Sequence, residues 1–80
     1  MKARVVIRLK PSILDAQGAS VLRALEGLGF PEVRDVRVGK VVDLDLDGID
    51  PETARRRIDE MCGRLLVNPV IEDFTVEVQS

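Results

Sequence analysis

Apolar and polar residues alternate at the start of the chain, and this period of two predicts a half-buried β-strand. The apolar positions of this strand are Ala3, Val5, Ile7 and Leu9. Pro11 and Ser12 interrupt the alternation, so the strand is expected to end before them. Apolar residues then recur at helical spacing, at Val21, Leu22, Leu25 and Leu28. The spacing predicts a helix, with Asp15 as its N-cap and Gly29 at its left-handed C-terminal end.

Two further alternating stretches predict strands at residues 33–38 and 41–47. Their valines and leucines share one face only if Val38 lies opposite Val42, because a slip of one residue turns every side chain to the other face. An odd loop over residues 39–41, or a bulge, is therefore expected between the two strands. The same register places Arg37 opposite Asp43 on the other face of the sheet.

A second helix is predicted from Asp50-Pro51-Glu52, which combines an N-cap, a proline at the first helical position and an acid in the first turn. Its buried stripe is expected to be Ala54, Ile58, Met61, Cys62 and Leu65. Pro69 disfavours the helical conformation at Asn68, so the helix should end by Val67 or Asn68.

The last strand is predicted from Ile71 to Gln79, with Leu65 and Leu66 covering a core above Phe74. The element order β-α-β-β-α-β predicts an α+β fold, a ferredoxin-like sandwich with two helices on one face of a four-stranded antiparallel sheet. Residues 1–80 form a single domain in this interpretation. A ladder of opposite charges is expected on the open face, between the first strand (Arg4, Arg8, Lys10) and the third (Asp43, Asp45, Asp47).

The composition argues against several classes of function. The net charge of −2 provides no basic field for nucleic acid, and no apolar run is long enough to cross a membrane. A single cysteine forms no intrachain disulfide and suits a reducing cytoplasm. The sequence contains no histidine, which removes the commonest general base and the commonest metal ligand.

Four motifs are candidates for chemistry, and none of them predicts an active site. Cys62 lacks a histidine to activate it and fits a packed core position. The acids Asp43, Asp45 and Asp47 alternate along one strand about 6.8 Å apart, which is too far for a compact cation cage without other ligands. The basic run 55–57 fans around a helix, and Gly39-Lys40 lacks the remainder of a phosphate-binding loop.

Five segments in register resemble the PurS family, the small subunit of phosphoribosylformylglycinamidine synthase. The matching segments are 9–11, 14–18, 28–30, 36–40 and 61–74, which read LKP, LDAQG, LGF, VRVGK and MCGRLLVNPVIEDF. The sequence departs from the family pattern at Ser12, Ala16, Val67 and Phe74, where glycine, proline, alanine and tyrosine are usual. These departures affect turn stiffness and one hydroxyl group.

The resemblance implies a non-catalytic bridging subunit in de novo purine biosynthesis. It implies that a PurL-type synthetase and a PurQ-type glutaminase are the partners, and that ATP and magnesium act on the synthetase. No catalytic, cofactor-binding or metal-binding residue is then expected on this chain, which would be a cytoplasmic homodimer that can pair further into a tetramer in isolation. Exposed polar residues within the matching segments are the predicted docking surface: Lys10, Gln17, Arg37, Lys40, Asn68 and Glu72. Asn68 has a second interpretation, as a cap of the second helix.

An alternative function is a regulatory module of the ACT type, which has the same topology and binds small molecules between paired domains. An acylphosphatase-like enzyme is disfavoured because Lys10-Pro11-Ser12-Ile13 is not a glycine-rich phosphate loop. A copper chaperone would need a Cys-x-x-Cys motif, and an RNA-recognition domain would need aromatic residues on its sheet.

Overall fold

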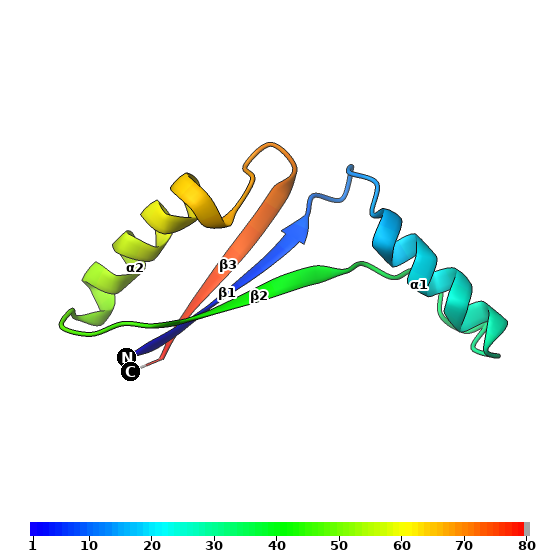
Figure 1. The fold of residues 1–80 in the computed structure, drawn as a ribbon, viewed down its shortest axis with the longest axis horizontal. Coiled ribbons are helices and arrows are strands. Elements are labelled where there is room, and N and C mark those ends of the chain that lie inside the picture. Colours follow the sequence, from blue (N-terminus) through cyan, green and yellow to red (C-terminus); the bar gives the residue numbers. More distant parts are fainter. Residues whose placement is uncertain (80) are drawn as a thin grey trace.

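A computed structural model describes residues 1–79 as a three-stranded antiparallel sheet with one helix packed on it and a second helix carried away from it (Figure 1). The elements are β1 (Lys2–Leu9), α1 (Ala16–Gly27), β2 (Gly39–Asp45), α2 (Pro51–Met61), the π-helical turn η1 (Cys62–Leu66) and β3 (Glu72–Gln79). β1 is the central strand, and the order across the sheet is β2-β1-β3. The predicted α+β class and both predicted helices are confirmed.

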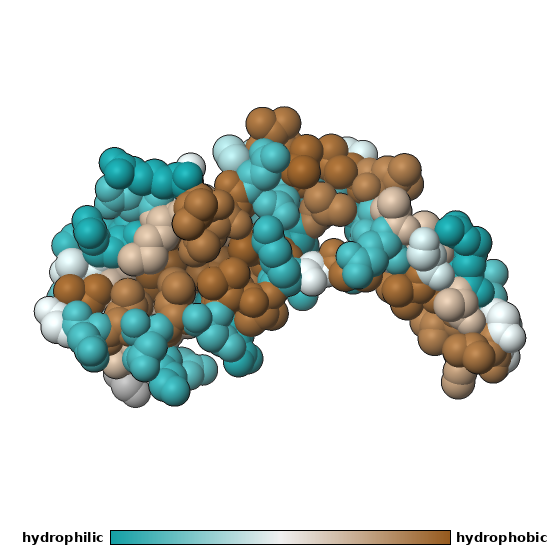
Figure 2. All heavy atoms as spheres, in the orientation of Figure 1, coloured by the Kyte–Doolittle hydropathy of each residue, from teal (hydrophilic) through white to brown (hydrophobic). Residues whose placement is uncertain are grey.

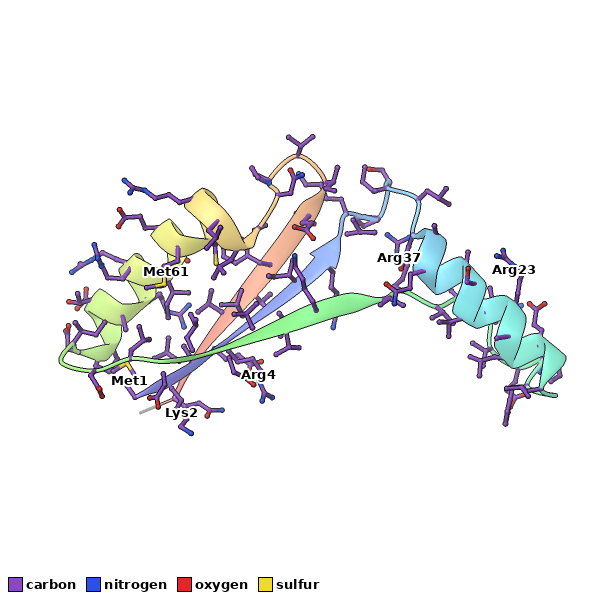
Figure 3. The ribbon with its side chains drawn as sticks, viewed as in Figure 1. Met1, Lys2, Arg4, Arg23, Arg37 and Met61 are labelled. Carbon is purple, nitrogen blue, oxygen red and sulfur yellow. The ribbon has the colours of Figure 1, made fainter. Side chains whose placement is uncertain are left out.

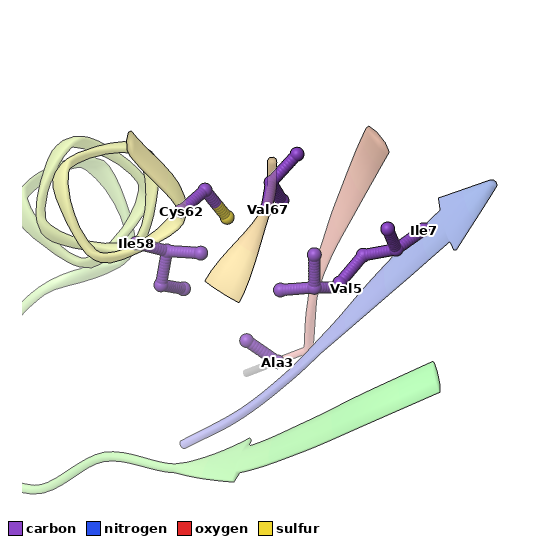
Figure 4. Close-up of a cluster of buried hydrophobic side chains, with 6 residues drawn as sticks. All are labelled: Ala3, Val5, Ile7, Ile58, Cys62 and Val67. Atoms are coloured by element: carbon purple, nitrogen blue, oxygen red, sulfur yellow. The ribbon is translucent and has the colours of Figure 1, made fainter. Parts of the chain in front are cut away.

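The hydrophobic core lies between the sheet and the helical segment α2–η1 (Figure 4). β1 contributes every second residue, because alternate side chains of a strand point to the same face. The core residues are Ala3, Val5, Ile7, Ile58, Cys62 and Val67. Val5, Ile58 and Cys62 are fully buried, so this small cluster carries most of the apolar burial that holds the sheet to α2.

Both ends of α2 follow from the local sequence. Asp50 accepts a hydrogen bond from the backbone N–H of Thr53 at 3.3 Å, and Pro51 occupies the first turn. The helical segment closes with η1, and Val67 is already extended, as Pro69 predicts. The expectation that Leu65 covers the core is wrong, because the wider π-helical turn changes the angular position of the residues that follow. Leu65 is 83% exposed, whereas its neighbour in η1 packs against the core.

The predicted charge ladder is present where the register allows it. Arg4 lies opposite Asp43, and its Nε donates to a carboxylate oxygen at 2.8 Å. Arg8 lies opposite Gly39 on β2 and opposite Asp73 on β3, so its acidic neighbour comes from the other edge strand. The ladder on the open face is therefore shared between β2 and β3.

The predicted hairpin over residues 39–41 is wrong. Gly39 is the first residue of β2 and lacks a positive φ, so it makes no turn. Gly39 instead allows the backbones of β2 and β1 to approach closely, because a Cβ at this position would lie 2.5 Å from the carbonyl oxygen of Ile7. The chain continues without reversing from segment 33–38 into β2 (Figure 1), so Arg37 is not opposite Asp43. Segment 33–38 pairs with no strand of the described chain, and the sheet of residues 1–79 has three strands rather than four.

Residues 11–38, which we name the arm, extend away from the sheet (Figure 1). The arm holds α1 and the returning segment 33–38, and α1 packs against no other helix or strand of residues 1–79. The radius of gyration is 16.1 Å, whereas a compact domain of this length would have about 12 Å. The expectation that both helices of one chain cover one face of its own sheet is therefore wrong, because the chain does not turn back at Gly39.

The predicted boundaries of α1 are confirmed. Asp15 is the N-cap and Gly29 has a φ of 94°, which ends the helix as expected. Apolar atoms line the concave side of the arm in Figure 2. Several of its large apolar side chains are exposed: Leu14 (83%), Val21 (38%), Leu28 (73%) and Phe30 (47%). The arm is thus a folded element whose exposed apolar side chains no other part of residues 1–79 covers.

Candidate functional site

The arm meets the sheet at residues 10–18 and 36–40, a region that we name the joint. Asp15 is its central residue. One carboxylate oxygen accepts the backbone N–H of Gly18 at 2.8 Å, and the other accepts that of Val38 at 2.6 Å. The residue is 6% exposed. The hydrogen bond from Gly18, followed by that from Val38, holds the pKa of this carboxyl below its ordinary value. One side chain thus caps α1 and attaches it to the residue that precedes β2.

Arg37 lies where the arm meets the strands of the sheet (Figure 3). Its Nη2 donates to the carbonyl oxygens of Lys10 at 3.0 Å and Ile13 at 3.1 Å. The same Lys10 carbonyl accepts the backbone N–H of Ile13 at 2.9 Å, which closes the turn between β1 and α1. The guanidinium group therefore fixes the start of the arm, and Arg37 is part of the joint as well as of its surface.

Glu72 connects the joint to the turn that precedes β3. Its carboxylate accepts the backbone N–H of Asn68 at 2.7 Å and lies 3.7 Å from Nζ of Lys40. Asn68 accepts the backbone N–H of Val70 at 3.1 Å through its side chain. The carboxamide of Asn68 therefore organises the 68–72 turn, and its hydrogen bond is not to α2.

A groove of about 340 Å³ lies between the arm and the end of the sheet where β1 ends and β2 and β3 begin. Gln17, Lys40 and Glu72 form part of its wall, and Ile7 and Val38 contribute apolar surface. The six residues predicted as a docking surface therefore gather around one joint, although they come from separate stretches of the chain. Gln17, Lys40 and Glu72 line the groove, Arg37 donates to the backbone carbonyl of Lys10, and the backbone N–H of Asn68 donates to Glu72.

The chemistry of the joint suits binding. It contains amines, a guanidinium, carboxylates and amides, all of them donors or acceptors for a polar partner surface. The only cysteine, Cys62, lies in the core, where burial raises the pKa of its thiol and leaves it a poor nucleophile. Residues 1–79 hold no group of acids or cysteine that could bind a metal ion. No helix within that range has the length and apolarity needed to span a membrane.

Sequence reasoning missed one part of the joint. Gly18 belongs to the matching segment 14–18, but its packing role is not predicted: a Cβ there would collide with the carbonyl oxygen of Val36 and lie 2.6 Å from Oδ2 of Asp15. The signal was a glycine inside an otherwise helical pattern, which lowers helix propensity unless close packing requires it. Asp15 was predicted as a cap, but its second hydrogen bond, to Val38, is tertiary and has no local signature.

Comparison with known proteins gives a consistent result. Residues 2–80 match the family model described as "PurS: Phosphoribosylformylglycinamidine (FGAM) synthase". The PurS subunit of Methanocaldococcus jannaschii is 40% identical over 78 residues, which cover 98% of this chain and 94% of that protein. The Bacillus subtilis PurS subunit is 42% identical over 78 residues, covering 98% of this chain and 92% of the relative.

Solved structures agree with the sequence comparison. The crystal structure of Methanocaldococcus jannaschii PurS superposes with a TM-score of 0.89 at 38% identity, covering 98% of this chain and 94% of that one. A chain of the structure of PurLQS from Thermotoga maritima superposes with a TM-score of 0.87 at 28% identity, covering 95% and 93% of the two chains. These similarities favour the first function expected from the sequence over the ACT-type alternative.

Proposed function

Because the chain belongs to the PurS family of phosphoribosylformylglycinamidine synthase subunits, we propose that it joins the synthetase and the glutaminase of that enzyme. The enzyme converts formylglycinamide ribonucleotide to the amidine with ATP and with ammonia taken from glutamine. The observation that carries the proposal is the similarity to a chain of the Thermotoga maritima structure named PurLQS, over nearly the full length of both chains. The expected partners are a PurL-type synthetase and a PurQ-type glutaminase.

The proposal divides the chemistry among the three subunits. A glutaminase of the cysteine type needs a histidine beside its nucleophile, and this sequence contains no histidine. We therefore assign glutamine hydrolysis to the glutaminase, and ATP and magnesium to the synthetase. This chain contributes no catalytic residue in the proposal. Its single free thiol, Cys62, fits the reducing cytoplasm in which we place the complex.

The contribution of this chain is positional. If it binds both catalytic subunits at once, their two sites keep one relative orientation, so ammonia can pass between them without a diffusional search through solvent. Such a bridge needs a defined shape. The hydrogen bonds of Asp15 and Arg37 supply it: Asp15 ties the start of α1 to Val38, the residue before β2, and Arg37 ties the arm to Lys10, the residue after β1.

We propose the joint as the docking surface for at least one catalytic subunit. Lys40 is the best position for a test, because its side chain is half exposed in the groove and its ion pair with Glu72 is long, at 3.7 Å. Arg37 is less suitable, since it also holds the turn that starts the arm.

The experiment compares Lys40→Glu with Lys40→Ala and with Arg55→Glu, an equal charge change on the exposed side of α2. Co-elution with the synthetase and the glutaminase is measured by size-exclusion chromatography. The proposal predicts that Lys40→Glu abolishes co-elution, that Lys40→Ala weakens it and that Arg55→Glu leaves it unchanged. Normal co-elution of Lys40→Glu rejects this surface.

The proposal includes a homodimer, with further pairing into a tetramer when the catalytic subunits are absent. The uncovered apolar residues of the arm support self-association, because an exposed apolar surface of this kind marks an interaction site. We also propose that the four-stranded ferredoxin-like arrangement expected from the sequence exists in the dimer rather than in one chain.

A further inference from the structure

The connection between β2 and α2, residues 46–50, contains the only Asp-Gly pair of the sequence, Asp47-Gly48. It lies at the end of the molecule opposite the arm (Figure 1), and both residues of the pair are exposed and outside any helix or strand. Gly48 has a φ of 76°, a left-handed conformation that strains any residue with a Cβ. The bend therefore requires glycine, and Asp47 is followed by the residue that shields the main-chain nitrogen least.

The polar groups of this pair are not engaged elsewhere in the described chain. Within residues 1–79 the backbone N–H of Gly48 donates no hydrogen bond. The Asp47 carboxylate forms no ion pair in the same range. Because Gly48 has no Cβ, its nitrogen is open to approach by the side chain of the residue before it. A reaction between the two groups thus breaks no existing interaction.

We infer that Asp47-Gly48 is a site of spontaneous aspartate isomerisation. The amide nitrogen of Gly48 attacks Cγ of Asp47, and the carboxyl hydroxyl group leaves with the N–H proton as water. The product is a five-membered succinimide ring. Water then adds to one of the two ring carbonyl carbons and breaks its bond to nitrogen. Attack at Cγ restores aspartate, whereas attack at the former main-chain carbonyl gives isoaspartate, in which the main chain runs through Cβ and Cγ.

The other aspartates lack this combination of features. Asp50 precedes Pro51, which has no N–H to lose. Asp45 is exposed, but the next residue, Leu46, carries a branched side chain, and its N–H donates to the carbonyl oxygen of Met1 at 2.9 Å. Every remaining aspartate also precedes a residue with a side chain. Isoaspartate is therefore expected at position 47 and not along β2.

Isomerisation lengthens a short connection between two fixed points. Leu46 is held by its hydrogen bond to Met1, and Asp50 caps α2 by accepting the backbone N–H of Thr53 at 3.3 Å. Isoaspartate adds one carbon atom to the main chain between these points. The end of β2 and the first turn of α2 must therefore shift relative to each other.

The modified site has a partner defined by chemistry. The carboxylate of isoaspartate is attached to Cα, and it is the group that an S-adenosylmethionine-dependent isoaspartyl methyltransferase esterifies. The methyl group moves from the sulfonium to a carboxylate oxygen, and S-adenosylhomocysteine leaves. The ester then closes to the succinimide with loss of methanol, so part of the modified chain returns to aspartate. This recognition is independent of the proposed bridging function.

The test ages the purified full chain in mildly acidic buffer, because water leaves from the protonated carboxyl group. Isoaspartate is quantified by methyl transfer from labelled S-adenosylmethionine with a purified isoaspartyl methyltransferase. Its position is read by electron-transfer fragmentation of the tryptic peptide 41–55. The matched control is Asp47→Glu, which keeps the charge but must close a six-membered ring, a much slower reaction. A synthetic peptide of residues 44–52 gives the rate without the fold.

The inference predicts isoaspartate at position 47, none at Asp45 and no methyl incorporation into Asp47→Glu. The rate in the folded chain should lie within about tenfold of the peptide rate, a barrier difference below about 1.4 kcal/mol. Absence of isoaspartate at position 47 overturns the inference, as does equal methyl incorporation into Asp47→Glu. A rate in the folded chain more than about tenfold below that of the peptide also overturns it, because the fold then protects the pair.

Discussion

Gly18 is the position where one added methyl group should disturb the arm most. A Cβ there would collide with the carbonyl oxygen of Val36 and lie 2.6 Å from the carboxylate of Asp15. One obstacle is backbone and the other is held by two hydrogen bonds, so neither can move freely. Gly27 is the matched control, because it ends the same helix and a Cβ there would meet no atom within 4 Å.

The magnitude follows from two opposing effects. Replacing glycine by alanine in a helix is worth about 0.5–1 kcal/mol, so Gly27→Ala should raise the free energy of unfolding by up to that amount. Gly18→Ala gains a similar amount from helix propensity, but the clash opposes this gain, because inserting an extra methyl into a packed site costs about 1–3 kcal/mol. The two variants should therefore differ by about 1–3 kcal/mol, with Gly18→Ala the less stable.

Thermal unfolding followed by circular dichroism measures the difference. For a domain of this size, 1 kcal/mol corresponds to about 4–8 °C in Tm, so Gly18→Ala should unfold at least about 4 °C below Gly27→Ala. Both proteins must be compared at one concentration, because association stabilises the folded state. Equal Tm values for the two variants would refute the close packing of α1 against segment 33–38.

Three further predictions concern the core, the thiol and the joint. Ile58→Ala removes a fully buried side chain from the cluster beneath α2, so it should lower the free energy of unfolding by about 2–5 kcal/mol. Urea titrations measure this loss, and a value below about 1 kcal/mol would mean that α2 does not cover the sheet as described. Cys62 should resist alkylation by iodoacetamide in the native protein and react rapidly in denaturant, because burial shields the thiol and raises its pKa. Labelling is measured by mass spectrometry, and fast labelling of the native protein would show that Cys62 lies outside the core. Asp15 has a lowered pKa in the folded chain, so its contribution is fully present above the ordinary carboxyl pKa of about 3.9 and is lost as the pH falls through the lowered value. Urea titrations from pH 7 to pH 2 should accordingly find that Asp15→Asn is less stable than the unmodified protein at pH 7 and loses less stability in acid. The same acid dependence in both proteins would mean that the Asp15 carboxylate does not make the described hydrogen bonds.

The elements with local signals could be predicted from the sequence. β1 follows from strict alternation, and both helices begin at the predicted aspartates, Asp15 and Asp50. The second helix also ends where Pro69 requires. In each case the determining interaction lies within a few residues of the chain, so a local pattern is sufficient.

The course of the chain at Gly39 could not be predicted, because glycine serves both turns and close contacts. Alternation in segment 33–38 indicates an extended conformation but does not identify its strand partner. The same limit applied to the joint: the six docking candidates came from motifs that match the family, whereas the hydrogen bonds of Arg37 and Glu72 depend on tertiary contacts. Leu65 was misplaced because a π-helical turn has no simple sequence signal.

Reconstitution of the complete reaction tests the central proposal most directly. The purified chain is mixed with the PurL-type synthetase and the PurQ-type glutaminase, and amidine formation is followed with glutamine as the nitrogen source and ATP present. We predict glutamine-dependent product only when all three proteins are combined, while the synthetase alone turns over with added ammonia. Equal glutamine-dependent rates with and without this chain would contradict its role as the bridge.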